Sequence, residues 1–144
     1  MIAVDTNVLI YAHRQDAEWH HEALATLKRL AEGPRRWAIP WPCVHEFYAI
    51  VTHPRIFDPP TPVADALLAL ETWRASSLQL LGETEEHWSV LSDLLRLAQV
   101  VGPMVHDARV AAICLQHGIE ELWSIDRDFS RFPALRVRNP LVSS

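Results

Sequence analysis

The sequence predicts a single α/β domain in which helices cover both faces of a mostly parallel sheet of four or five short strands, an α/β/α sandwich. Short apolar segments of strand length alternate along the chain with segments whose apolar residues recur at helical spacing. The 144 residues, 49% hydrophobic and 22% charged, match one globular domain that is large enough to bury a core. Such alternation is typical of parallel sheets, because each parallel neighbour requires a crossover connection.

The sequence pattern predicts two strands and three helices in the first half of the chain. Asp5 ends the first apolar segment, and Gly33-Pro34 ends the second helix. Pro42 suits the first turn of the helix after the second strand, where a missing N–H is tolerated. Residues 53–62 contain four prolines and are expected to form a loop. The expected strands are 2–5 and 36–40, and the expected helices are 6–14, 17–32 and 43–53.

The second half continues the alternation. Thr61-Pro62 is a capping residue followed by a first-turn proline, and Thr84 with two acids after it indicates the start of the next helix. Gly102-Pro103 breaks the chain before a mostly apolar helix that ends at Gly118. Residues 126–132 are expected to form a turn with a short helical piece. The expected helices are 63–75, 84–99 and 104–118, and the expected strands are 77–81, 121–125 and 134–139.

The composition excludes several functional classes. No apolar stretch has the length of a membrane span and the start lacks a basic signal segment, so we expect a cytoplasmic protein. Cys43 and Cys114 lie in apolar helical segments and are expected to be buried thiols. A net charge of -5 argues against nucleic acid held by bulk positive charge. Lys28 is nevertheless the only lysine among 13 basic residues, and the arginines suit bidentate phosphate contacts.

Several acids are expected to meet at one edge of the sheet. Ligands of open parallel sheets bind outside the carboxyl ends of the strands. Asp5 closes the first strand, Asp126 closes the strand 121–125, and Asp128 follows two residues later. Glu46 lies in the first turns of the helix after the second strand, near the same edge. Helix capping is the simplest explanation of Asp5 taken alone, and only the wider set of acids favours a site.

Asp107 is the most informative of these acids. Helical spacing places it at the head of an apolar stripe that runs to Cys114. A charge directed toward buried surroundings is costly unless it is paired or binds a metal. The alternative to a site is a salt bridge to one of three arginines, Arg109, Arg127 or Arg131.

A bound cation is the more economical way to stabilise the whole set of acids, because clustered carboxylates repel one another. Ligands that are all oxygen favour Mg²⁺, for which Mn²⁺ can substitute. The eight histidines show no spacing typical of a zinc site.

Four segments together resemble a known family. MIAVDTNVLIYA, PCVHEFYAIV, VHDARVAAICLQHG and SIDRDFSRFP, in this order and spacing, look like a PIN-domain ribonuclease, specifically a VapC-type toxin of a toxin–antitoxin pair. The resemblance runs from Met1 to about Pro140 and implies one PIN domain over residues 1–144. Each motif alone is short, but an acid in every expected place makes the ordered set specific.

The resemblance also implies roles for individual residues. The metal-binding carboxylates of the family fall on Asp5, Glu46, Asp107 and Asp126. An accessory acid and three polar residues that help to orient the site fall on Asp128, Thr6, Asn7 and Ser124. We expect Asp5, Asp107 and Asp126 to hold one Mg²⁺, and Glu46 with Asp128 to complete a second position.

The function implied by the resemblance is that of a Mg²⁺-dependent endoribonuclease toxin. Such a protein inhibits translation and growth unless a cognate VapB-like antitoxin binds it, and a homodimer is expected. The products would carry 5′-phosphate and 3′-hydroxyl ends. Residues 53–62 are a candidate for RNA-specific recognition, and Trp19 and Trp41 for interfaces. Arginines expected near RNA phosphates are Arg14, Arg55, Arg127 and Arg131.

Two other functions compete with this interpretation. A phosphatase of the haloacid dehalogenase type would use Asp5 as a nucleophile and a second acid two residues later, but Asn7 occupies that position. A non-catalytic PIN-like scaffold would bind RNA or protein, and a pure binding surface gains nothing from clustered like charges.

Overall fold

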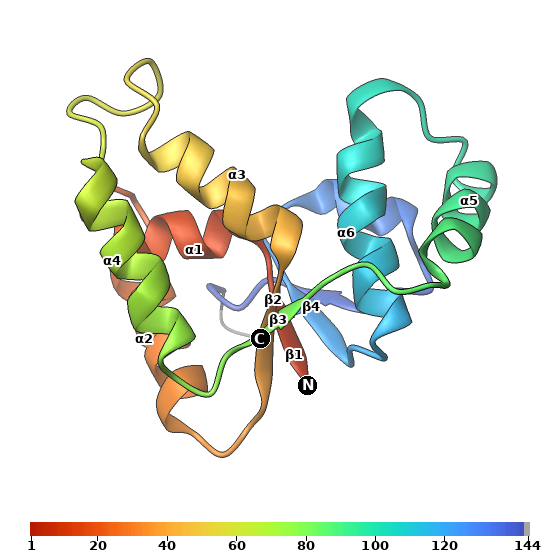
Figure 1. Ribbon diagram of the computed structural model, residues 1–144, viewed down its shortest axis with the longest axis horizontal. Coiled ribbons are helices and arrows are strands. Elements are labelled where there is room, and N and C mark those ends of the chain that lie inside the picture. Colours follow the sequence, from red (N-terminus) through yellow and green to blue (C-terminus); the bar gives the residue numbers. More distant parts are fainter. Residues whose placement is uncertain (143–144) are drawn as a thin grey trace.

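The five strands of the computed structural model, which describes residues 1–142, all run parallel in one sheet. Their order is β3-β2-β1-β4-β5, so the first strand of the chain lies at the centre (Figure 1). The predicted parallel sheet of four or five strands is therefore confirmed. The strands are β1 Ile2–Val4, β2 Trp37–Pro40, β3 Gln79–Leu81, β4 Glu121–Trp123 and β5 Val137–Arg138.

The helices divide between the two faces of the sheet. The chain moves outward from β1 to β2 and β3, and then returns past them to β4 on the other side of β1. Because such crossovers are right-handed, this reversal places the helices on opposite faces. In Figure 1, α1 to α4 lie on one side, and α5 and α6 lie on the other. The helices are α1 Thr6–His13, α2 His20–Glu32, α3 Trp41–Val51, α4 Val63–Arg74, α5 His87–Leu97 and α6 Val105–Gln116, with short 3₁₀ helices η1 Gly102–Met104 and η2 Arg127–Arg131.

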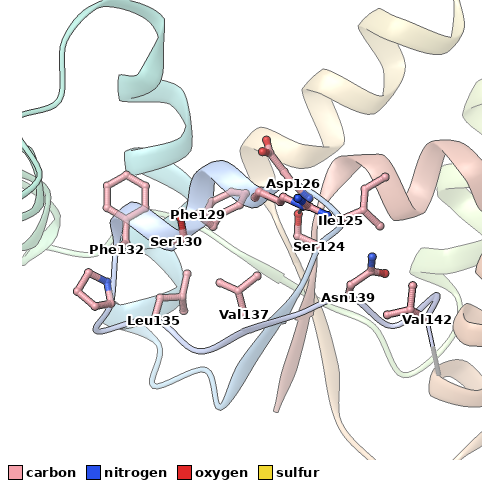
Figure 2. Close-up of a pocket in the computed structure, with 12 residues that line it drawn as sticks. Ser124, Ile125, Asp126, Phe129, Ser130, Phe132, Leu135, Val137, Asn139 and Val142 are labelled. Carbon is pink, nitrogen blue, oxygen red and sulfur yellow. Dashed lines mark hydrogen bonds between the residues drawn. The ribbon is translucent and has the colours of Figure 1, made fainter. Parts of the chain in front are cut away.

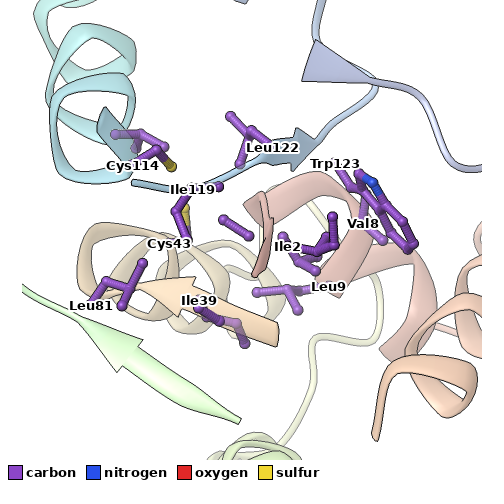
Figure 3. Close-up of a cluster of buried hydrophobic side chains, with 14 of the residues drawn as sticks. Ile2, Val8, Leu9, Ile39, Cys43, Leu81, Cys114, Ile119, Leu122 and Trp123 are labelled. Atoms are coloured by element: carbon purple, nitrogen blue, oxygen red, sulfur yellow. The ribbon is translucent and has the colours of Figure 1, made fainter. Parts of the chain in front are cut away.

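The hydrophobic core fills the space on both faces of the central strands. Ile2 and Val4 of β1 are completely buried, as is Leu122 of β4. Figure 3 shows Cys43 of α3 and Cys114 of α6 within this cluster, and both are free and buried as predicted. Burial raises the pKa of both thiols, so they remain protonated at neutral pH. Among residues 1–142, every helix is too short or too polar to span a lipid bilayer.

Several predicted boundaries were wrong by a few residues. The helix predicted from residue 84 begins at His87, because the Thr84 backbone N–H and hydroxyl both donate to Gln116 Oε1, at 2.9 and 3.0 Å. The helix predicted from residue 17 begins at His20, after a turn closed by the Ala17 N–H and the Arg14 carbonyl.

Thr61 does not cap the helix that follows it. Pro62 occupies the N-cap position of α4, and no side chain caps that helix. The Thr61 hydroxyl instead lies 3.1 Å from His13 Nε2 and accepts from Arg14 Nη1 at 3.2 Å. This contact attaches the loop of residues 53–62, which contains no helix or strand as predicted, to the end of α1.

Replacing Leu122 by alanine is expected to destabilise the domain by about 2–5 kcal/mol, because the change leaves a cavity in a packed core. Leu122 is fully buried between β1 and β5. Leu97→Ala is the matched control, since Leu97 is 84% exposed. Urea unfolding of both variants measures the difference. Equal free energies of unfolding would contradict the arrangement of the sheet.

Candidate metal centre

Asp5 and Ser124 lie side by side where the strand order reverses. β1 and β4 are neighbours, and Val4 is level with Trp123, so the next residues of both strands leave the sheet together. This is the point at which doubly wound sheets form ligand sites, because the connections on either side depart in opposite directions. The Ser124 hydroxyl donates to Asp5 Oδ2 at 2.7 Å. The pairing of two strands thus joins residues that are 119 positions apart in the sequence.

Asn7 connects the first helix to the segment that carries Asp126. Its Nδ2 lies 3.3 Å from both Asp5 Oδ2 and Ser124 Oγ, and its Oδ1 accepts from the Ile125 N–H at 3.3 Å. The Asp126 N–H donates to Ser124 Oγ at 3.0 Å. Ser124 therefore contacts both acids, and Asn7 fixes the backbone between them. The role of these polar residues was expected only from the family resemblance, and the structure shows the hydrogen bonds that they make.

Asp5 is a buried carboxylate whose two oxygens both have partners. Its side chain is among the few buried polar groups, at 7% exposure. The Cys43 thiol donates to Oδ1 at 3.5 Å, while Ser124 and Asn7 donate to Oδ2. Burial raises the pKa of Asp5, and the hydrogen bonds from Ser124 and Cys43 oppose that rise. Sequence reasoning missed Cys43 as a donor, because its apolar neighbours indicated only packing.

The capping explanation of Asp5 is wrong. Asp5 precedes α1, but its side chain makes no capping hydrogen bond to that helix. Thr6, which follows it, has a buried hydroxyl without a hydrogen-bond partner among residues 1–142. Of the three polar residues predicted to orient the site, Asn7 and Ser124 thus contact the acids, whereas Thr6 makes no such bond.

Asp107, Asp126 and Asp128 form the closest group of acids. One carboxylate oxygen from each lies within 4.8 Å of the others. Asp107 extends from the first turn of α6, while Asp126 and Asp128 come from the turn after β4. The Asp128 N–H donates to Asp126 Oδ1 at 2.9 Å and so fixes the spacing of these two acids. Neither Asp5 nor Glu46 belongs to a group this close within the described part of the chain.

The remaining acids still act on Asp107 electrostatically. Partial burial raises the pKa of Asp107 to about 6, and the charges of four acids contribute to that rise. In order of effect these acids are Asp126, Asp5, Asp128 and Glu46. The charges of Asp5 and Glu46 therefore reach Asp107 although neither acid belongs to the close group.

A salt bridge does not neutralise Asp107. Arg109, one of the candidate partners, donates from Nε to Glu83 Oε1 at 2.9 Å instead. Among residues 1–142, Asp107 has no ion pair within 4.0 Å. The alternative interpretation of Asp107 as half of an ion pair is therefore wrong.

Glu46 approaches the acids from α3. Phe47, its neighbour on the helix, is completely buried, so Glu46 leaves the helix on a more exposed side. Partial burial raises the pKa of Glu46, as do the charges of Asp5 and Asp126, while His106 of α6 opposes the rise. Glu46 thus borders both the acids and the first turn of α6.

The arginines predicted to contact RNA lie in different places. Arg14 lies beyond the far end of the eight-residue α1, about 12 Å along the helix from Asp5. Its guanidinium pairs with Asp16 at 2.7 Å and lies 4.2 Å from the centre of the Phe57 ring. The structure therefore does not bring Arg14 to the acids. The other three are exposed, with Arg55 in the proline-rich loop and Arg127 and Arg131 in η2 beside Asp128.

A cavity of about 700 Å³ lies on the other side of the segment that carries Asp126 (Figure 2). Phe132, Leu135 and Val137 contribute apolar walls. The carboxylate of Asp126 points away from these side chains in Figure 2. Asp126 thus borders this cavity, although its carboxylate is directed away from the apolar walls.

The fold and the site together define a class, a doubly wound parallel α/β protein with a carboxylate cluster at the switch in strand order. The chain belongs to the PIN-domain family, whose model matches residues 2–135, and within it to the VapC ribonucleases. Ribonuclease VapC43 of Mycobacterium tuberculosis is 36% identical over 142 residues, which cover 98% of this chain and 96% of the relative.

Solved structures share the fold at lower sequence identity. VapBC2 from Rickettsia felis, bound to a DNA fragment from its promoter, matches with a TM-score of 0.71 and 18% identity, covering 96% of this chain and 98% of that one. The sarcin-ricin loop cleaving toxin VapC20 of Mycobacterium tuberculosis matches with a TM-score of 0.66 and 17% identity, covering 90% and 93%.

Proposed function

We propose that this chain, an enzyme of the nuclease class by its family, is a Mg²⁺-dependent endoribonuclease toxin that acts through the acidic cluster. The observation that carries the proposal is the close group of Asp107, Asp126 and Asp128, whose carboxylate oxygens lie within 4.8 Å of one another. Nothing in the described structure neutralises Asp107 by an ion pair. Clustered carboxylates of this kind are costly without a cation.

The residues present fit a hard divalent cation. The close group offers only carboxylate oxygens, which are the ligands that Mg²⁺ and Mn²⁺ prefer. Asp107, Asp126 and Asp128 would hold the ion, in place of the set Asp5, Asp107 and Asp126 expected from the resemblance, with Asp5 and Glu46 beside them. When bound, such an ion supplies a water of lowered pKa and offsets charge on the leaving oxygen.

The chain's own contribution is to hold these acids in place. Ser124 and Asn7 fix Asp5 against the turn that carries Asp126, and a backbone N–H fixes Asp126 relative to Asp128. This network lies on the ends of two paired strands, which are rigid supports for a site. An acidic face also repels RNA, so substrate binding depends on neutralisation of the acids.

The proposed partners follow from the relatives. VapC43 is named as a ribonuclease, VapC20 as a toxin that cleaves the sarcin-ricin loop, and VapBC2 as bound to a DNA fragment from its promoter. For this chain we accordingly propose an RNA substrate, a VapB-like antitoxin, a homodimer and a place in the cytoplasm. A basic segment of the antitoxin would be attracted to the same acids. The alternative, a non-catalytic scaffold, predicts no dependence of activity or stability on the metal.

Mg²⁺ is expected to stabilise the folded protein, and more strongly at pH 7.5 than at pH 5. The pKa of Asp107 in the metal-free protein is raised to about 6, so its proton competes with the ion below that pH. At ten times the dissociation constant, binding contributes about 1.4 kcal/mol, or a rise in Tm of roughly 3–6 °C.

The metal-free protein should show the opposite trend. Between the ordinary pKa of 3.8 and about 6, the folded state keeps a proton that the unfolded state loses, so stability decreases as pH rises through this window. Differential scanning fluorimetry with Mg²⁺ and with a chelator, from pH 5 to pH 7.5, measures both trends. A Mg²⁺ effect that is absent or independent of pH would count against the proposed site.

A further inference from the structure

A cleft of about 260 Å³ adjoins the acidic cluster between α3 and α6. Its lining residues from α3 include Pro42, His45 and Glu46, and those from α6 are His106, Arg109 and Val110. Glu46 belongs to both the cleft and the set of acids that act on Asp107. The cleft and the acids therefore share Glu46 as a common boundary.

The cleft differs from the acidic cluster in its chemistry. Three nitrogen-bearing side chains, His45, His106 and Arg109, line it together with one carboxylate. They form no close metal-binding group with Glu46 within the described residues. Arg109 uses Nε to bond Glu83, which leaves four of the five guanidinium N–H donors for another acceptor. Planar N–H groups of this kind suit phosphate oxygens.

An exposed aromatic ring at the start of α3 contacts one of the residues that line the cleft, although the ring itself lines a neighbouring apolar hollow with Leu67 and Trp73. Trp41 is 41% exposed, and its ring lies 6.0 Å from that of His45 with an interplanar angle of 34°. Proteins that bind single-stranded nucleic acid use such exposed rings as platforms for bases. His45 therefore joins the two features: it lines the cleft with the cationic Arg109 and contacts the ring of Trp41, on a chain whose net charge is -5.

We propose that the cleft between α3 and α6 binds a single-stranded RNA segment that flanks the bond to be cut, with Arg109 and His106 on phosphate oxygens and Trp41 with His45 against a base. This inference rests on the proposed ribonuclease function, because it concerns the path of the same substrate. In this proposal Arg109 takes the phosphate-binding role expected of Arg14, because Arg14 is held at the far end of α1.

The test measures RNA binding separately from cleavage. Asp107→Asn provides a background for equilibrium binding of a fluorescent single-stranded RNA, followed by anisotropy in Mg²⁺ at several salt concentrations. In that background, Arg109→Gln is expected to weaken affinity and to reduce the slope of log Kd against log salt by about 0.7, as for one lost phosphate contact. Arg109→Lys should restore the slope, because it keeps the charge.

Trp41→Leu is expected to weaken affinity by about 5-fold or more with no change in the salt slope, because stacking is not an ionic contact. Trp41→Phe keeps a ring and should recover most of the affinity. Thermal melting of each variant checks that it remains folded.

Matched controls come from α5. Arg96→Gln removes an exposed arginine that pairs with Asp93, and Trp88→Leu removes a 72% exposed tryptophan. Both are expected to leave affinity and slope unchanged. If Arg109→Gln and Trp41→Leu bind RNA like these controls while the unsubstituted chain still cleaves RNA, the cleft proposal is wrong and the ribonuclease proposal stands. If the unsubstituted chain neither binds nor cleaves RNA, both fail.

Discussion

Replacing Asp107 by asparagine is expected to reduce RNA cleavage by at least about 100-fold, because the proposed metal loses a charged ligand and the charge stabilisation that it supplies. The same change should make the metal-free protein slightly more stable at pH 7.5. Four neighbouring acids act on the ionised Asp107, and asparagine removes that repulsion. The gain is expected to be about 1 kcal/mol or less, since Asp107 is partly exposed and solvent screens its charge.

Cleavage assays and urea unfolding of the metal-free variant measure the two effects together. Asp93→Asn is the matched control, because Asp93 is an exposed acid on α5 that pairs with Arg96. The control should keep full activity. It should lose about 1 kcal/mol of stability at most, since exposed ion pairs contribute no more than that. If the Asp107→Asn protein cleaves RNA at the normal rate, Asp107 is not part of the catalytic site. One that is strongly destabilised would show that Asp107 supports the fold.

Replacing Ser124 by alanine is expected to cost about 1–3 kcal/mol in stability, because a buried carboxylate loses a hydrogen-bond donor. The Ser124 hydroxyl makes the shortest contact to Asp5, at 2.7 Å, and also accepts from the Asp126 N–H. Both acids therefore lose a common support. Cleavage should decrease by about tenfold or more, because small displacements of catalytic groups have large effects on rate.

Ser124→Thr keeps the hydroxyl and should retain more of the stability and activity than the alanine variant. Ser130→Ala is the matched control, since Ser130 is exposed in η2. Thermal unfolding and cleavage rates of the three variants are compared. Equal behaviour of the Ser124→Ala and Ser130→Ala proteins would mean that the contact between Ser124 and Asp5 has no role.

The sequence was sufficient to predict the sheet and the positions of the acids for a physical reason. Strand ends and helix starts follow from local patterns, and in a parallel sheet they share one edge. Asp5 and Asp126 could thus be assigned to the same edge from their places after two strands. The strand order, which makes those two strands direct neighbours, depends on long-range packing and appeared only in the structure.

The contacts of individual side chains were harder to predict. Cys43 has apolar neighbours in the sequence, yet its thiol points to Asp5, because α3 begins beside the end of β1. Arg14 was expected near phosphates by its charge, but Asp16 and Phe57 hold it at the other end of α1. Thr61 and Thr84 have the residue type of helix caps, but the Thr61 hydroxyl bonds Arg14, and the Thr84 hydroxyl donates to Gln116 while accepting from the Glu86 N–H before the helix begins. Tertiary contacts of this kind leave no local signal.

The most direct test of the central claim is cleavage of single-stranded RNA by the purified protein, with Mg²⁺ and with a chelator, beside an Asp126→Asn variant. Asp126 belongs to the close group of acids and bonds the Asp128 backbone. We predict fragments with 5′-phosphate and 3′-hydroxyl ends in Mg²⁺, and none with the chelator or with the variant. Cleavage that continues undiminished in the chelator, or in the Asp126→Asn protein, would contradict a metal-dependent nuclease at this site.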